Sequence, residues 1–168
     1  MHKNTIIELF LSHIEKNNSD KEIFYTKDKD KYIPFTIREL ILQIYLLVKF
    51  FRELKLISGD KIAIFSESRI EWVAVDFACM FCRLITIPIY TSQSNSQIKY
   101  ILENSETKLC FVSNQLLLDK ISGVKGELPE MKQIIIFNEL IKKDSNEELI
   151  KNFGEIISSE KQLSEKEI

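Results

Sequence analysis

The residues of this chain that are best placed for binding chemistry lie in two short polar segments. They are Ser66, Ser68, Arg69, Thr91 and Ser92. The first three follow the apolar run 61–65, and the other two follow the apolar run 84–89. Hydroxyl and guanidinium groups hydrogen-bond phosphates and carboxylates, and open parallel sheets bind ligands where strands end and helices begin. The alternative is structural, since Ser68 and Glu71 have the spacing of a helix capping box.

The cysteines offer a second kind of chemistry, but their placement argues against it. Cys79 and Cys82 have the Cys-x-x-Cys spacing of redox sites. A reactive thiol in such a site opens a helix, where the helix dipole lowers its pKa. These two residues instead fall in the last turns of an apolar segment, where the dipole has the opposite sign. We expect both of them, and Cys110 within a predicted strand, to be buried structural residues.

The glycines and histidines also lack the context of a catalytic site. Gly123 and Gly126 follow a predicted helix rather than a strand, without the Lys-Ser or Lys-Thr ending of a phosphate loop. His2 and His13 belong to no metal-binding pair and to no nucleophile–base set. The sequence therefore predicts no catalytic residue and no metal site.

The composition is that of a soluble globular protein of one domain. The 168 residues are 45% hydrophobic and 29% charged, with 23 Lys and Arg against 25 Asp and Glu. This balance leaves no basic surplus for nucleic acid, and an odd cysteine count favours the reduced thiols of the cytoplasm. The N-terminus has no signal-peptide pattern, and the apolar segment Leu40–Phe51 is shorter than the roughly 20 residues that span a bilayer. We expect a cytoplasmic protein without a transmembrane segment, with peripheral membrane contact left open.

Helix-start signals and hydrophobic periodicity predict alternating strands and helices. Capping boxes fall at Thr5–Glu8, Thr36–Glu39, Ser68–Glu71, Ser94–Gln97 and Ser145–Glu148. The predicted helices are 5–16, 37–56, one that opens at Ser68, 95–104, 115–122 and 146–153. The predicted strands are 22–26 and 31–35, which form a hairpin, and 61–65, 84–89, 108–113 and 133–137. Gly59, free to adopt positive φ, is expected to separate the long second helix from the strand that follows it.

Strands that are joined by crossover helices run parallel. The expected fold class is α/β, with a mostly parallel sheet, helices on both faces and a small β-hairpin. No internal repeat or linker divides the chain, so residues 1–154 are expected to form one domain. Residues 155–168 are polar and charged and are expected to form a partly disordered tail.

Four segments carry motifs in an ordered series. They read Phe35-Thr36-Ile37-Arg38-Glu39-Leu40, Gly59-Asp60-Lys61-Ile62-Ala63-Ile64, Ser66-Glu67-Ser68-Arg69-Ile70-Glu71-Trp72 and Ile87-Pro88-Ile89-Tyr90. In this order and spacing the chain resembles the adenylate-forming (AMP-binding) synthetase family over about residues 22–137. The Arg-x-Glu-Trp turn and the Pro-Ile-Tyr ending are similar to long-chain fatty-acid–CoA ligases in particular.

The resemblance implies the N-terminal subdomain of the acyl-adenylate synthetase fold. It also implies a ligase of fatty acid metabolism that joins a fatty acid to CoA through an acyl-adenylate, with ATP, Mg and CoA as cofactors of the full-length enzyme. The family's Ser/Thr/Gly-rich phosphate loop and its C-terminal catalytic lysine have no counterpart here, because the chain has only four scattered glycines. We therefore expect a truncated part of a longer enzyme, inactive alone and without tight cofactor binding, whose main partner is the remainder of the same polypeptide.

Arg83 is a departure from the family, because several of its members have glycine five residues before the proline. If this position requires positive φ, an arginine there costs about 1 kcal/mol. Otherwise the loop differs in this chain.

Two other classes of function stay open. One is a free-standing, non-catalytic module that binds a nucleotide or an acyl chain at its strand ends. The other is a phosphoacceptor or redox regulator of flavodoxin-like shape, which is disfavoured because no predicted strand ends in an acidic pair. If the chain is instead part of a ligase, sheet edges and apolar surface that the rest would cover favour self-association, with a homodimer as one form.

Overall fold

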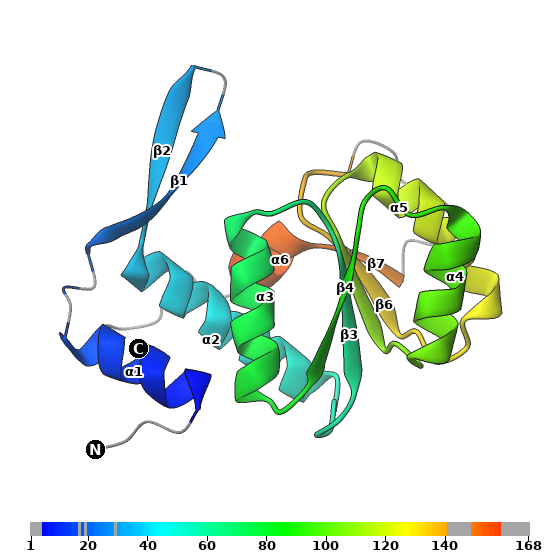
Figure 1. Cartoon of the computed structure of the whole chain (residues 1–168), viewed down its shortest axis with the longest axis horizontal. Coiled ribbons are helices and arrows are strands. Elements are labelled where there is room, and N and C mark those ends of the chain that lie inside the picture. The colour runs from blue at the N-terminus through cyan, green and yellow to red at the C-terminus, as the bar shows by residue number, and fades with distance from the viewer. Residues whose placement is uncertain (1–4, 17, 19, 29, 141–148, 159–168) are drawn as a thin grey trace.

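Five parallel strands in the order β4-β3-β5-β6-β7 form the central sheet of the computed structural model (Figure 1). The structure describes residues 5–16, 18, 20–28, 30–140 and 149–158. The sheet strands are β3 (Lys61–Phe65), β4 (Ile85–Ile89), β5 (Leu109–Val112), β6 (Gln133–Ile136) and β7 (Ile150–Asn152). The helices are α1 (Ile6–Lys16), α2 (Ile37–Glu53), α3 (Ile70–Phe81), α4 (Asn95–Asn104), α5 (Gln115–Ser122) and α6 (Phe153–Ser158), with a short 3-10 helix η1 (Lys125–Glu127). Strands β1 (Glu22–Asp28) and β2 (Lys31–Thr36) form an antiparallel hairpin, so the predicted mixed α/β class is confirmed.

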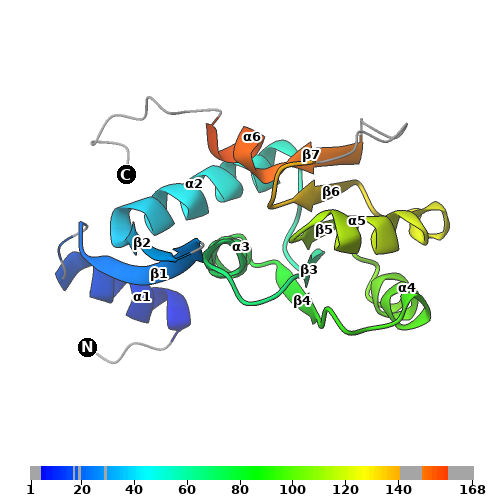
Figure 2. The same cartoon turned by 90° about the horizontal axis from the view of Figure 1, so that it is seen from above.

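The strand order creates a topological switch point between β3 and β5. After β3 the chain forms the edge strand β4 and then returns past β3 to form β5. The helix after β3 packs on one face with α2 and α6, whereas the helix after β5 packs on the other face with α4 (Figures 1 and 2). The two connections therefore leave β3 and β5 in opposite directions. In doubly wound sheets such a crevice is where ligands bind.

Alternation along the strands divides the core into two layers. In β3, Ile62 and Ile64 face the layer of α2, α3 and α6, while Ala63 and Phe65 face the layer of α4 and α5. All four residues of β5 are fully buried as well. Consecutive apolar residues are what a strand needs when helices cover both of its faces, which explains why the apolar runs of the sequence predicted the sheet.

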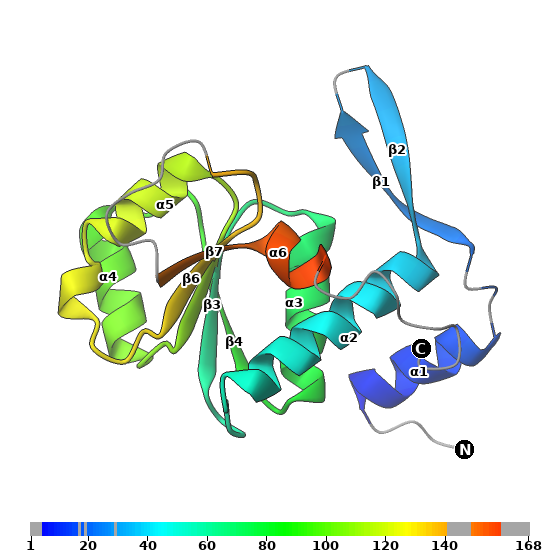
Figure 3. The same ribbon diagram turned by 180° about the vertical axis from the view of Figure 1, so that it is seen from behind.

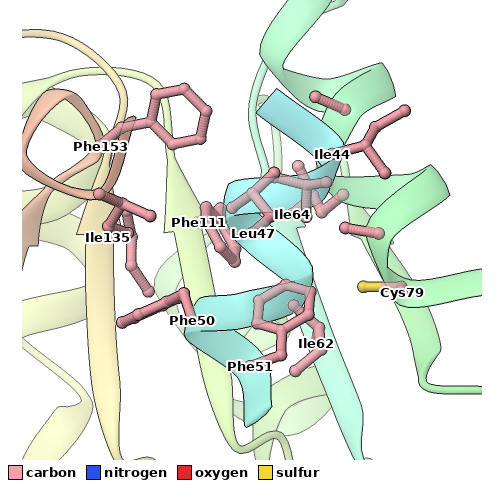
Figure 4. Packing of buried hydrophobic residues seen from close by; sticks show 14 of the residues in the cluster. Ile44, Leu47, Phe50, Phe51, Ile62, Ile64, Cys79, Phe111, Ile135 and Phe153 are labelled. Carbon is pink, nitrogen blue, oxygen red and sulfur yellow. The ribbon is translucent and has the colours of Figure 1, made fainter. Parts of the chain in front are cut away.

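Aromatic rings connect α2 to the sheet and to α6 within the first layer (Figure 4). Phe111 of β5 lies between Phe51 of α2, edge to face at a centroid distance of 6.2 Å, and Phe137, stacked at 5.7 Å. Phe137 in turn meets Phe153 of α6 edge to face at 5.1 Å. Each such pair contributes about 0.5–1.5 kcal/mol beyond the burial of area, so this series stabilises the packing of both helices on the sheet.

Capping boxes form at three of the five predicted positions. The Thr36 and Ser94 side chains each accept from the backbone three residues on, and Glu39 and Gln97 accept from the cap residues in return. The Thr5–Glu8 box has the same two hydrogen bonds. The Ser145–Glu148 box lies outside the described residues.

The box predicted at Ser68 is wrong. The N-cap of helix α3 is Arg69, one residue later than predicted, and it makes no side-chain cap hydrogen bond. This start places Glu71 one residue too early to close a box, and its carboxylate binds the Arg69 side chain instead.

Helices α2, α3 and α4 all end in a Schellman motif whose left-handed residue is charged. These residues are Lys55 (φ 54°), Arg83 (φ 57°) and Glu106 (φ 52°). At the end of α3, the Leu84 N–H donates to the Cys79 carbonyl and the Arg83 N–H donates to the Met80 carbonyl, which is the Schellman pattern. Arg83 therefore occupies a positive-φ position, as the family pattern suggested, and α2 ends before the predicted Leu56 for the same reason.

We expect glycine at these positions to stabilise the chain. Arg83→Gly should raise the free energy of unfolding by about 1 kcal/mol, because glycine adopts positive φ without the Cβ clash that arginine meets. Lys55→Gly and Glu106→Gly should act in the same direction. Gly59→Ala is the matched control: at φ 92° it should lower stability. Urea unfolding followed by circular dichroism measures these changes, and no gain from any of the three glycines would contradict the assigned strain.

The structure differs from the predicted helix 146–153 in its described part. Residues Ile150–Asn152 form β7, which pairs in parallel with β6. The Asn152 side chain then accepts from the Gly154 N–H and caps α6. Sheet pairing therefore overrides local helical spacing here, and α6 follows directly as Phe153–Ser158.

The hairpin stands away from the sheet, beside the start of α2 (Figure 3). Helix α1 packs on α3 through Phe10, whose ring stacks on Phe77 at 4.2 Å. No helix in the described part of the chain has the length and apolarity needed to cross a bilayer.

Candidate functional site

The switch point brings the loop after β3 next to the end of β5. Ser113, fully buried, donates from its hydroxyl to Oε2 of Glu67 at 2.5 Å. Asn114 donates to the Ser113 hydroxyl at 3.2 Å, and its own side-chain oxygen caps α5 by accepting from the Leu117 N–H. The candidate site thus contains the Glu67 carboxylate, which is held by a hydrogen bond from the end of the neighbouring strand β5.

Arg69 uses all three nitrogens of its guanidinium to join this loop to α3 and to the segment after β6. Nε and Nη2 donate to the two carboxylate oxygens of Glu71 at 2.8 and 2.7 Å. Nη1 donates to Oδ1 of Asn138 at 2.9 Å, and the group lies 5.1 Å from the centre of the Phe137 ring. Asn138 is itself held by a hydrogen bond from Asn152 to its carbonyl. Arg69 therefore acts as a clamp between the β3 loop and the ends of β6 and β7.

Electrostatics favours this clamp. Burial acts to raise the pKa of Glu71, but the hydrogen bonds from Arg69, a backbone hydrogen bond and the charge of Arg69 together hold that pKa below its ordinary value. Both side chains are only about a fifth exposed. A bidentate pair of this kind is much stronger than a solvated surface pair.

The loop after β4 is held from the other side of the sheet. Lys120 of α5 donates to the carbonyls of Thr91 and Gln93, both at 3.3 Å. The Lys120 ammonium also lies 5.9 Å from the centre of the Phe65 ring. Thr91 and Ser92 themselves are exposed. Their loop follows the edge strand rather than the switch point.

The structure places the five predicted site residues in two loops, one after β3 and one after β4. Arg69 is engaged within the chain, Ser66 donates to the neighbouring Glu67 carbonyl, and Ser68 is exposed. Thr91 and Ser92 lie one strand further out. Whether any of the five faces a ligand stays a prediction.

Sequence reasoning missed Glu67, Ser113 and Asn138. The signal for Ser113 was present, because Ser113 and Asn114 follow an apolar strand in the same way as the two segments that were selected. What the sequence lacked was the strand order, which alone makes β5 the neighbour of β3.

Cys79 and Cys110 are buried as predicted, whereas Cys82 is only partly buried. Burial raises the pKa of Cys79 and of Cys110 to about 12. Burial also raises the pKa of Cys82, which is half-buried at the end of α3. All three thiols are thus protonated at neutral pH, which disfavours nucleophilic or redox chemistry. Within the described residues, no group of three His, Cys, Asp or Glu side chains could hold a metal ion.

Comparison with known proteins identifies the family. The profile of the AMP-binding enzyme family matches residues 11–165. The long-chain-fatty-acid–CoA ligase FadD15 of Mycobacterium bovis is 30% identical over 78 residues, which are 46% of this chain and 13% of that protein. The long-chain-fatty-acid–CoA ligase ACSBG2 of Xenopus laevis is 28% identical over 138 residues, 82% of this chain and 18% of its own length.

Solved structures share the fold. The anthranilate CoA ligase AuaEII, in complex with anthranoyl-AMP, superposes with a TM-score of 0.76 at 18% identity, over 90% of this chain and 27% of its own. The coronafacic acid ligase from Pectobacterium brasiliense gives a TM-score of 0.73 at 19% identity, over 92% of this chain and 29% of its own. The matches thus span less than a third of each of these proteins, and the chain belongs to the AMP-binding enzyme family.

Proposed function

We propose that this chain is the N-terminal part of a long-chain fatty-acid–CoA ligase. The full enzyme would convert ATP, a fatty acid and CoA into acyl-CoA, AMP and pyrophosphate through an acyl-adenylate. The observation that carries the proposal is the match to the AMP-binding enzyme family over nearly the whole chain, with long-chain fatty-acid ligases among its curated relatives.

The residues at the switch point are not suited to bind the phosphates of a nucleoside triphosphate. Glu67 places a carboxylate at the crevice, where it would repel phosphate, and Arg69, the cation of the same loop, is engaged by Glu71. A phosphate cradle also needs closely spaced glycines whose backbone N–H groups converge, and the four glycines of the chain are scattered. The catalytic groups are therefore expected elsewhere in the polypeptide, and ATP, Mg and CoA are not expected to bind this chain tightly.

The role that remains is structural. The Arg69 clamp fixes the loop after β3, and Lys120 fixes the loop after β4, at one end of the two-layer core. Ser66, Ser68, Thr91 and Ser92 would then be the residues able to face substrate or a neighbouring part of the enzyme. The chain would supply a rigid wall of the active site, and the reacting groups would come from elsewhere in the polypeptide.

ATP–pyrophosphate exchange tests this proposal. The isolated 168-residue chain is expected to show no exchange above background, with or without a long-chain fatty acid, because its sequence has no counterpart of the family's phosphate loop and catalytic lysine, which stabilise charge on the transferring phosphorus. The gene product isolated from its own cells should show exchange that depends on the fatty acid. Robust ATP–pyrophosphate exchange by the isolated chain would overturn the assignment, and so would exchange by the native product that does not depend on the fatty acid.

A further inference from the structure

We propose that the β1–β2 hairpin is the docking element through which this chain is fixed to the remainder of the longer polypeptide. The proposal rests on the proposed function, which supplies that remainder. The hairpin surface consists of Phe24, Tyr25, Tyr32 and Ile33. These side chains are 38%, 58%, 68% and 51% exposed, respectively.

The exposed apolar side chains lie on both faces of the hairpin. Residues that are directly opposite in an antiparallel pair share a face. The register pairs Tyr25 with Pro34 and Lys27 with Tyr32, so both tyrosines lie on one face. Thr26 pairs with Ile33, and Phe24 pairs with Phe35, so Phe24 and Ile33 lie on the opposite face. A hairpin that is meant to stay in water would keep at least one face polar.

Little within the described chain supports this hairpin. It extends away from the sheet and from α6, and meets the rest of the chain near the start of α2 (Figures 1 and 3). A two-stranded hairpin on its own is marginally stable in water. Four of the fourteen exposed large apolar side chains in the described residues belong to this one hairpin. Patches of this kind mark interaction sites.

The strand edges indicate how a partner would engage the hairpin. Pro34 removes one backbone donor from β2, which weakens that strand as a pairing edge. Strand β1 has no proline, so its outer edge offers a full set of donors and acceptors. Apolar faces on both sides together with one open edge fit insertion between two apolar layers, with a further strand paired to β1.

The occupant that best fits is the rest of the same polypeptide. In the solved relatives, a region matching 90–92% of this chain is only 27–29% of the protein. Such proteins therefore carry more than twice as much further chain, enough to cover a hairpin on both faces. A second copy of this chain is the competing occupant, and the experiment separates the two.

Tyr32→Lys tests the proposal, with Tyr100→Lys as its matched control. Tyr100 on α4 is 67% exposed, against 68% for Tyr32, and lies outside the hairpin. In the isolated chain neither variant should change Tm by more than about 1 °C. In the native gene product, Tyr32→Lys should lower Tm by roughly 3 °C or more, because the charge enters a buried interface, whereas Tyr100→Lys should not. Amide exchange over residues 22–36 should be at least about tenfold slower in the native product than in the isolated chain.

The proposal would be overturned if the two lysine variants changed the Tm of the native product equally. It would also be overturned if amide exchange over residues 22–36 were equally fast in the native product and in the isolated chain. Hairpin protection that rises with the concentration of the isolated chain would assign the surface to a second copy instead. A native product of 19.7 kDa would remove the proposed partner and overturn it too. A further outcome is a long native product that is destabilised by Tyr32→Lys but not by Tyr100→Lys, yet shows no fatty-acid-dependent ATP–pyrophosphate exchange. This result would support the docking role of the hairpin and refute the proposed ligase function.

Discussion

Replacing Phe111 with alanine is expected to lower the free energy of unfolding by about 3–5 kcal/mol. Phe111 is fully buried in the central strand β5 (Figure 4). Its ring lies 6.2 Å from that of Phe51 and 5.7 Å from that of Phe137. Alanine would leave a cavity lined by apolar groups that cannot close without moving α2. Urea unfolding of the chain, monitored by circular dichroism, gives the change directly.

Two variants keep this test informative if Phe111→Ala does not fold. Phe111→Leu should cost clearly less, since most of the volume remains. Leu116→Ala, at a side chain that is 68% exposed, should change stability by no more than about 0.5 kcal/mol. A small cost for Phe111→Ala would mean that the ring series is not the centre of this core layer.

Replacing Arg69 with methionine is expected to cost about 2–3 kcal/mol. The change keeps much of the side-chain volume but leaves the Glu71 carboxylate, only a fifth exposed, without its bidentate partner. Oδ1 of Asn138 also loses its donor. Arg38→Met is the matched control, because Arg38 pairs at 2.9 Å with Asp20, whose side chain is 65% exposed. That surface pair should contribute less than about 1 kcal/mol.

The effect of Arg69→Met should depend on pH. Arg69 holds the pKa of Glu71 below its ordinary value in the folded chain, so the contribution of the pair is fully present above that ordinary value of 4.5. It is lost as the pH falls through the lowered pKa, where Glu71 becomes protonated. The stability difference between the parent chain and the variant should therefore shrink between neutral pH and about pH 3. A difference that does not change with pH would refute the ion pair as its source.

The sequence was sufficient for the parts of the fold that local chemistry decides. Apolar runs predicted four of the five sheet strands, and three of these, β3, β5 and β6, are buried almost throughout because helices cover both of their faces. Gly59 and Arg83 marked backbone turns that the structure confirms at positive φ. Strand β7 was missed because its three residues gain their conformation only by pairing with β6.

The candidate site was only partly predictable, for a related physical reason. Polar residues after strands could be found in the sequence, but the partners of each depend on which strands are neighbours. Glu67 meets Ser113, 46 positions away, because β5 returns to the side of β3. Long-range pairing therefore decided this contact. The Ser68 box failed for a local reason, since Glu71 pairs with Arg69, only two positions away, rather than with a cap residue.

The mass of the gene product in its own cells tests the central proposal most directly. An antibody raised against this chain would be used to blot a whole-cell lysate. A band several times heavier than 19.7 kDa is expected, because the matched regions are only 13–29% of the relatives described above. A single band at 19.7 kDa would contradict the proposal, and the free-standing binding module would then become the leading hypothesis.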